Sequence, residues 1–368
     1  MNPMTQFCHN LDCPARGQVG QGNITIHSQK EHRYRCKTCG RTFAATTGTP
    51  FYRLHQAVDV VTIVLTLLTH GCPLQAIVAA FGLDERTVAA WLRRAGQHAQ
   101  QLHQHLIQRG QLDLQHVQAD ELWVKLVGSH VWQAMALAVP TRLWLGGVIS
   151  AQRDRHLIRA LVQQVRASAV TLAILVCVDG LASYITAFRQ GFRQRVLTGK
   201  PGRPRLDPEP GLLIGQVIKQ YAKRRVVSVT RRIVQGSEAA IGQVLKATRS
   251  GTDINTAYIE RLNATFRSAL ACLVRRGRAI AHTQTLLNAG MWLVGSCYNF
   301  CWSHDSLRER ASVGAPLKWD ARTPAMAAGL TDHQWTMGEL LTYQVPPPPW
   351  VPPKRRGRPP KRQLVVTA

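Results

Sequence analysis

Four of the nine cysteines lie near the start of the sequence, in two pairs whose spacing is suited to metal binding. Cys8 and Cys13 form the first pair, and Cys36 and Cys39 form the second after 22 intervening residues. The two-residue spacer of the second pair lets both thiolates reach one tetrahedral Zn²⁺. A segment this small needs a metal to fold, so we expect a zinc ribbon over residues 1–50. The histidines that could replace one cysteine as a ligand are His9, His27 and His32.

Acidic residues are scarce in this chain, which makes the position of each one informative: 20 Asp and Glu stand against 46 Lys and Arg. Asp120 lies inside an expected strand, Asp179 at the carboxyl end of another, and Glu260 in an expected helix. Carboxylate oxygens are good ligands for Mg²⁺, and a pair of such ions can activate a water or a 3′-hydroxyl for phosphoryl displacement. Taken singly, each acid could also belong to a turn, a strand end or a surface ion pair. Together the three predict a Mg²⁺ (or Mn²⁺) site.

The segment after the expected ribbon has the pattern of a helix-turn-helix DNA-binding domain over residues 51–110. Its apolar positions predict three helices, over 58–68, 74–81 and 85–94. Gly82 provides the turn, and Asp84 is suited to cap the third helix. The outward face of that helix would meet phosphates or base edges through Arg86, Thr87, Arg93 and Arg94. The alternative is a generic packed helical pair, and a polar helical linker is expected over 97–111 in either case.

The middle of the chain changes to the short apolar runs that indicate strands. Three such runs, separated by turn residues, predict an antiparallel meander over 117–127, 131–139 and 143–150. A helix over 154–167, a strand over 172–178 and a helix from Ala182 are expected to follow. Three antiparallel strands, a helix and then a parallel strand are the beginning of a ribonuclease H-like α/β fold, which we expect over residues 111–310. A helical extension is expected over residues 311–344.

Length and charge narrow the class of protein. At 368 residues the chain is long enough for two or three domains, and its 45% of hydrophobic residues can form a sizeable core. The net charge of +26 predicts a polyanionic partner, with nucleic acid first and a membrane surface second. No apolar run reaches the roughly 20 residues of a spanning helix, and the N-terminus lacks the pattern of a secretory signal. We therefore expect an intracellular protein without a membrane segment.

Basic residues concentrate in two further segments. The stretch between the second and third acids is the most basic part of the chain, and its Arg224 and Arg225 are expected to neutralise DNA phosphates. Residues 345–368 begin as a stiff proline-rich linker and end in a basic tail that we expect to be disordered. The sequence R-G-R-P in this tail resembles an AT-hook, whose Arg356 and Arg358 would enter a narrow minor groove. The alternative is a solvated tether that touches phosphates of any sequence.

Three short motifs occur in order along the chain: D-E-L-W at 120–123, D-G-L-A-S-Y at 179–184 and I-E-R-L-N at 259–263. Each motif is weak alone. The ordered set resembles the DDE transposases of bacterial insertion sequences, specifically those of the IS-one type. The resemblance spans nearly the whole chain, since that family also places a zinc ribbon and a helix-turn-helix ahead of its catalytic domain.

The resemblance implies roles for individual residues. Asp120, Asp179 and Glu260 would hold the catalytic Mg²⁺ or Mn²⁺ ions. Arg267, seven residues after Glu260, matches a basic position near the attacked phosphate, and Asn263 matches a residue that organises the site or contacts the substrate. Neighbours on a strand face opposite sides, so only one residue of the pair at 120–121 is expected in the site. The resemblance favours Asp120 over its neighbour Glu121.

The function implied is that of a DNA transposase, which cleaves the ends of its element by metal-dependent hydrolysis and joins the 3′-hydroxyl to target DNA. Its partner would be double-stranded DNA, and two element ends imply at least a homodimer in the active assembly. We expect the protein to be cytoplasmic and associated with the nucleoid of a prokaryotic cell. Two alternatives stay open: a DNA-binding regulator that has lost the chemistry, and a structure-selective nuclease on the same fold.

Overall fold

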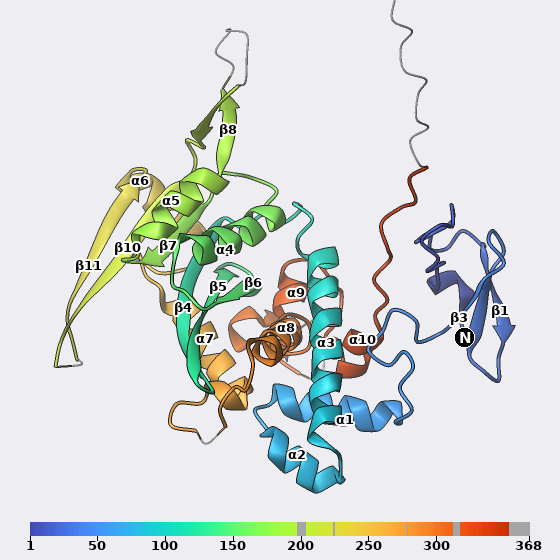
Figure 1. The fold of residues 1–368 in the computed structure, drawn as a ribbon. Coiled ribbons are helices and arrows are strands. Elements are labelled where there is room, and N and C mark those ends of the chain that lie inside the picture. Colours follow the sequence, from blue (N-terminus) through green and yellow to red (C-terminus); the bar gives the residue numbers. More distant parts are fainter. Residues whose placement is uncertain (197–203, 224, 278, 312–316, 353–368) are drawn as a thin grey trace, which may run out of the picture. The chain divides into compact units, whose positions relative to one another are not determined.

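The protein is described from a computed structural model, and the residues it describes are 1–196, 204–223, 225–277, 279–311 and 317–352 (Figure 1). The chain forms two compact units, one of Met1–Gly48 with the segment from Gln344, and one of Thr49–Tyr343. The expected domain boundary at residue 50 falls close to this division, whereas those at 110 and 310 lie inside the larger unit. No helix in the described part of the chain has the length and apolar composition needed to cross a bilayer.

The smaller unit is built on a three-stranded antiparallel sheet of β1 (Ile24–Ser28), β2 (Arg33–Cys36) and β3 (Thr42–Ala44), preceded by the short turn η1 (Pro3–Thr5). Its core is small, because only a few apolar side chains, among them Ile24, Tyr34 and Phe43, pack with the cysteines. A core of this size supplies little of the free energy of folding, as the sequence suggested.

The predicted proline-rich linker begins as part of this smaller unit. The side-chain amide of Gln344 donates hydrogen bonds to the carbonyls of Ala45 and Thr47. The guanidinium of Arg16 donates to the carbonyls of Pro348 and Pro349. The start of the linker is therefore tied to the smaller unit through Arg16, and the residue just before it through Ala45 and Thr47.

The larger unit begins with three helices, α1 (Val58–Thr69), α2 (Leu74–Phe81) and α3 (Glu85–Leu106). Gly82 ends α2 in the left-handed conformation at φ +60°, and the Asp84 carboxylate caps α3 by accepting from the Arg86 and Thr87 amides. These two features are as the sequence predicts. The stretch over 97–111 is helical to Leu106, as expected, but it is not a linker, because it continues α3 unbroken and packs along α8 (Gln284–Phe300).

A six-stranded mixed sheet forms the centre of the larger unit, in the order β11-β10-β7-β4-β5-β6. Its strands are β4 (His116–Leu126), β5 (Ser129–Ala138), β6 (Leu143–Ser150), β7 (Leu175–Asp179), β10 (Leu213–Ala222) and β11 (Arg225–Gln235). The predicted antiparallel meander is β4-β5-β6, and the predicted parallel strand is β7 beside β4. Strands β10 and β11 extend the sheet where only a basic segment was expected.

Helices cover both faces of this sheet, as the burial of β4, β5 and β6 requires (Figure 1). A side chain at Gly146 would meet Gln164 of α4 (Arg155–Ser168), whereas one at the next residue, Gly147, would meet Met291 of α8. Since neighbours on a strand face opposite sides, α4 and α8 lie on opposite faces. Helix α5 (Ala182–Gly191) packs on α4, and α7 (Ala257–Ala269) packs on β4 and β5.

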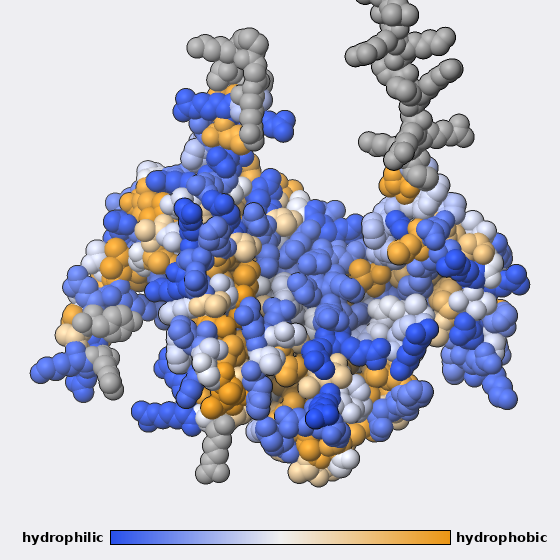
Figure 2. Space-filling model, in the orientation of Figure 1, coloured by the Kyte–Doolittle hydropathy of each residue, from blue (hydrophilic) through white to orange (hydrophobic). Residues whose placement is uncertain are grey.

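The remaining elements are short or lie at the margins of the larger unit. They are the hairpin of β8 (Arg193–Val196) and β9 (Arg205–Pro208), α6 (Glu238–Ala247), η2 (Ala271–Leu273), η3 (Asp305–Leu307), the pair β12 (Glu309–Arg310) and β13 (Trp319–Asp320), α9 (Pro324–Ala327) and α10 (Met337–Thr342). On the face drawn in Figure 2 most of the larger unit is hydrophilic, in keeping with the net charge of +26.

Candidate functional site

The four predicted cysteine ligands meet in the smaller unit. The sulfur atoms of Cys8, Cys13, Cys36 and Cys39 all lie within 4.8 Å of one another. The Cys8 and Cys39 sulfurs are 3.7 Å apart, and those of Cys13 and Cys36 are 3.9 Å apart. Thiolates around a tetrahedral ion with bonds of about 2.3 Å would be about 3.8 Å apart, so the cluster has the dimensions of a metal site.

The protein groups around the cluster affect the thiols differently. Burial and neighbouring thiols raise the pKa of Cys8 well above its ordinary value. Burial also acts to raise the pKa of Cys39, but hydrogen bonds from Arg41 and Asn10 and the adjacent sulfurs outweigh it and bring the value to about 7. The surroundings of Cys39 therefore favour its thiolate, the form that binds a metal. The alternative histidine ligands are not in the cluster, and burial lowers the pKa of the nearest, His9, to about 4.

The acidic residues gather in a notch of the central sheet. Strand β7 ends at Asp179, and its pairing with β4 stops at Ala119. Strands β4 and β10 on either side run further, so the sheet has a gap beyond the end of β7. A pocket of about 510 Å³ lies there, which we call the carboxylate pocket. Its charged lining residues are Asp120, Glu121, Asp179, Lys219, Glu260, Arg267 and Arg275.

Three of the four carboxylates in this pocket are in close contact. Asp120, Glu121 and Asp179 each place an oxygen within 4.8 Å of the others. Glu260 lines the same pocket, but its carboxylate accepts hydrogen bonds from Lys219 and from the Thr256 hydroxyl, and it is not in the group of three. The structure therefore brings the predicted Asp120 and Asp179 together, with Glu121 closer to them than Glu260.

The expectation that only one of the two neighbouring acids would enter the site is wrong. Beyond Ala119, β4 has no partner strand on the β7 side. Side chains from both faces of β4 can therefore turn into the gap, with Asp120 on the side of α7 and Glu121 on the side of α5. Each is held by a donor from its own side: Asn263 Nδ2 donates to Asp120 over 2.8 Å, and the Tyr184 hydroxyl donates to Glu121 over 2.7 Å.

Burial and mutual repulsion set the charge state of these acids. Burial, followed by the charge of Glu121, raises the pKa of Asp120 to about 7. Burial and the charge of Asp179 also raise the pKa of Glu121, against the opposing effects of Tyr184 and Arg153. The Arg153 guanidinium forms an ion pair with Glu121 and another with Asp179, the latter at 3.1 Å. A divalent cation between these carboxylates would relieve the same repulsion.

Two positioning residues were not found from the sequence. The side-chain oxygen of Gln118, buried on β4, accepts from the Tyr258 and Ile259 amides at 3.0 and 3.1 Å. These are otherwise unpaired donors at the start of α7, so Gln118 fixes the helix that carries Glu260. Gln216 on β10 donates to the Asp179 carbonyl over 3.0 Å and holds the end of β7. A glutamine in a strand has no sequence pattern that marks such a role.

Cations line the pocket beside the acids. Arg267 lies on α7 and faces the pocket as predicted, and its pKa is lowered, chiefly by burial and then by the charge of Arg275. A guanidinium this poorly solvated is suited to bind an anionic oxygen. The pocket therefore combines hard oxygen ligands with groups that can hold a phosphate.

The predicted DNA-contacting residues on α3 have different surroundings. Arg86 and Arg93 are exposed, whereas Thr87 and Arg94 are half-buried, and Arg94 donates to the Tyr52 carbonyl over 2.6 Å. Arg225 is exposed at the start of β11. The predicted contacts Arg224, Arg356 and Arg358 lie outside the described residues.

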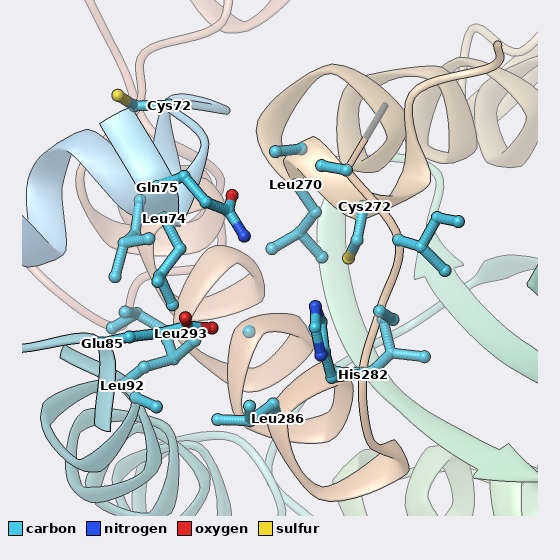
Figure 3. A pocket seen from close by; sticks show the side chains of 18 of the residues that line it. Cys72, Leu74, Gln75, Glu85, Leu92, Leu270, Cys272, His282, Leu286 and Leu293 are labelled. Carbon is cyan, nitrogen blue, oxygen red and sulfur yellow. The ribbon is translucent and has the colours of Figure 1, made fainter. Parts of the chain in front are cut away.

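A second pocket, of about 580 Å³, lies between α2, α3, η2 and α8 (Figure 3). Leucines are the commonest residues of its wall, and its polar members include Gln75, Glu85 and His282 (Figure 3). Among the described residues no three metal-ligating side chains of this second pocket lie close enough together to share an ion, whereas three carboxylates of the carboxylate pocket do. No protein-family model and no curated protein sequence matches this chain.

Proposed function

We propose that this protein is a DNA transposase that cleaves the ends of its element with Mg²⁺ or Mn²⁺ and joins the released 3′-hydroxyl to target DNA. The observation that carries the proposal is the meeting of Asp120 and Asp179, predicted from separate motifs, in one pocket with Glu260 and Arg267. An element has two ends, so a homodimer or larger assembly would do this work on double-stranded DNA.

The sheet supports a ribonuclease H-like catalytic domain. Three antiparallel strands are followed by α4 and by β7, which lies parallel to β4. The acids lie on the first of these strands, at the end of the fourth and on a later helix. This order of elements and acids is the one that the three motifs predict.

The donor set of the pocket fits a hard divalent cation, because carboxylate oxygens converge there. Asp120, Asp179 and Glu260 would hold the ions, and Glu121 is near enough to join them. When bound, two such ions activate the attacking oxygen and stabilise the leaving one. For this set to form, Arg153 must release Asp179, and Lys219 must release Glu260.

The chain's own residues would prepare the substrate. Asn263 holds Asp120 in place by donating to one of its carboxylate oxygens. Arg267 would bind the phosphate under attack, and Arg275 beside it adds to the attraction. Gln118 and Gln216 maintain the positions of α7 and β7, so that the acids converge before any substrate arrives.

The other parts of the chain fit a protein that binds duplex DNA. The cysteine cluster would hold Zn²⁺, which suits four thiolates at these separations and would supply the folding free energy that the small core lacks. The exposed arginines of α3 and the net charge of +26 would attract phosphates. Specific binding of the element ends is assigned to α1–α3.

The test is cleavage of a duplex carrying the sequences that flank the gene, with and without Mg²⁺. We expect metal-dependent nicking at the element ends, reduced at least about 100-fold by Asp179→Ala, because a lost ligand displaces the ion at the reacting oxygens. Asp113→Ala is the matched control, since Asp113 is exposed and outside the pocket, and it should leave nicking unchanged.

Equal nicking by the wild type and Asp179→Ala would show that the carboxylate pocket is not the active site. Binding of the ends without nicking by the wild type would favour a regulator. Nicking that depends on the structure of the DNA and not on the sequence of the element ends would favour a structure-selective nuclease.

A further inference from the structure

The β4–β5 hairpin carries three aromatic rings on one face, beside the carboxylate pocket. Trp123 on β4 lies directly opposite Trp132 on β5, and His130 lies two residues before Trp132. The ring of Trp123 is stacked with that of His130, at 5.8 Å between centroids and 24° between planes. Trp123 is nevertheless 54% exposed. A large ring held in place by its neighbour with more than half of its surface in water is suited to contact a ligand.

This aromatic row leads directly to the acids. Trp123 lies two residues after Glu121, so the two side chains share a face of β4. The guanidinium of Arg153 lies 5.1 Å from the centre of the Trp132 ring and forms ion pairs with Glu121 and Asp179. Arg153 thus contacts both the aromatic row, through Trp132, and the acids of the carboxylate pocket. A ligand on Trp123 would therefore lie two residues along β4 from Glu121.

The charges around the rings point to the kind of ligand. Lys125 and His130 face each other across the hairpin, and both are exposed. At the other end the Arg153 guanidinium lies over Trp132 but already pairs with Glu121 and Asp179, so the exposed Lys125 is the cation here that is placed to attract a phosphate. Flat rings interleaved with cations bind single-stranded nucleic acid, because each base stacks on a ring while its phosphates meet the cations.

We infer that Trp123, with His130 and Trp132, is a stacking platform for an unpaired base of the DNA strand that enters the carboxylate pocket. This inference rests on the proposed function and adds to it a preference for opened DNA. Stacking on an exposed ring favours binding of a free base, whereas a base in a duplex must first be unstacked and unpaired at a cost in free energy. The platform therefore favours strands that are already frayed or unpaired next to the cleavage position.

The test is a binding measurement without divalent metal, using a fully paired duplex and the same duplex with three unpaired thymidines at one end. We expect Trp123→Ala to weaken binding of the unpaired end about 10-fold and to leave binding of the paired duplex nearly unchanged. Trp123→Phe keeps a stacking surface and should retain most of the affinity. Trp319→Ala is the control, because Trp319 is 40% exposed and lies on β13, outside the carboxylate pocket.

The outcomes separate the platform from the proposed function. If Trp123→Ala binds the unpaired end as the wild type does, or loses affinity equally for both duplexes, the platform is wrong even where the wild type cleaves DNA. The same holds if Trp123→Phe loses as much as Trp123→Ala. If the wild-type protein binds neither duplex, both the stacking platform and the transposase proposal are wrong. Thermal unfolding of each variant checks that a lost affinity does not come from a lost fold.

Discussion

Glu121 shows how single side chains determine what the carboxylate pocket can do. Its carboxylate is buried, and it is stabilised by the Tyr184 hydroxyl and by Arg153, so it can stay in the fold without a metal. The D-E-L-W and D-G-L-A-S-Y motifs contain both Glu121 and Tyr184, yet nothing in their spacing shows that they touch. Asp120 and Asp179 were singled out by short motifs in a chain with few acids, and the structure brings them together. Their partners were not, because glutamine, tyrosine and arginine are common in many other roles.

Among the buried ionisable residues, His103 gives a prediction about pH. Burial lowers the pKa of His103 to about 4, and its Nε2 lies 3.1 Å from the Leu145 carbonyl, between the rings of Trp144 and Trp292. The folded protein keeps this ring neutral, whereas the unfolded chain takes up a proton below its ordinary pKa of about 6.5. The free energy of unfolding should therefore fall as the pH is lowered from 6.5 to 4, by at most about 1.4 kcal/mol per pH unit from this group.

His103→Gln removes the titration while an amide can still donate to the Leu145 carbonyl. Urea unfolding followed by tryptophan fluorescence should show a lower stability at pH 7, because ring contacts are lost, but a smaller decrease between pH 6.5 and 4. His55→Gln, at an exposed position, should keep the wild-type decrease. An unchanged decrease in His103→Gln would contradict the assignment.

At the scale of elements, the decisive feature is that β7 is shorter than both of its neighbours. The meander and β7 were predictable, since apolar runs separated by turn residues identify them. Strand β11 was missed because it is an exposed edge strand rich in arginine, without a buried face to give an alternating pattern. The buried first half of β10 went unpredicted within the same basic segment. The notch between β4 and β10 therefore could not be predicted, although Asp120, Asp179 and Glu260, which line it, were named as candidates.

The continuation of α3 has a similar explanation. The polar residues after Gln97 suggested a linker, but Ala95, Ala99 and Leu102 form a buried stripe at helical spacing. Gly96 in this stripe lets α3 approach α8 closely, since a Cβ there would lie 2.4 Å from the Ala289 Cα. Gly96 and Ala289 at this crossing are small enough to let the predicted helix-turn-helix pack closely against the rest of the larger unit.

Two glycine substitutions test this packing. Gly96→Ala should destabilise the larger unit by about 1–3 kcal/mol, because the added methyl meets backbone atoms that cannot move without shifting a helix. Gly242→Ala in α6 is the matched control, since a Cβ there has no neighbour within 4 Å. It should stabilise by about 0.5–1 kcal/mol through helix propensity. Thermal unfolding of both variants measures the difference, and equal midpoints would contradict the close approach.

At the scale of the whole molecule, the chain is two compact units with different sources of stability. The larger unit has an extensive apolar core around its sheet, whereas the smaller one packs a few side chains around four cysteines. The sequence predicted the division near residue 50, because the cysteines stand apart from the helical and strand patterns. It did not predict that residues 344–349 belong with the first unit, since a proline-rich segment has no pattern that identifies what it contacts.

The division into units leads to a prediction about metal removal. We expect one Zn²⁺ per chain, and Cys36→Ser should lose it and unfold the smaller unit, because the metal supplies the folding free energy there. The unfolding transition of the larger unit should stay within about 1 °C of the wild type, since its core is separate. Cys72→Ser is the control, because Cys72 is outside the metal cluster, and it should keep the zinc. Elemental analysis and calorimetry provide both measurements. Zinc retained by Cys36→Ser, or a larger unit that unfolds together with the smaller one, would contradict this account.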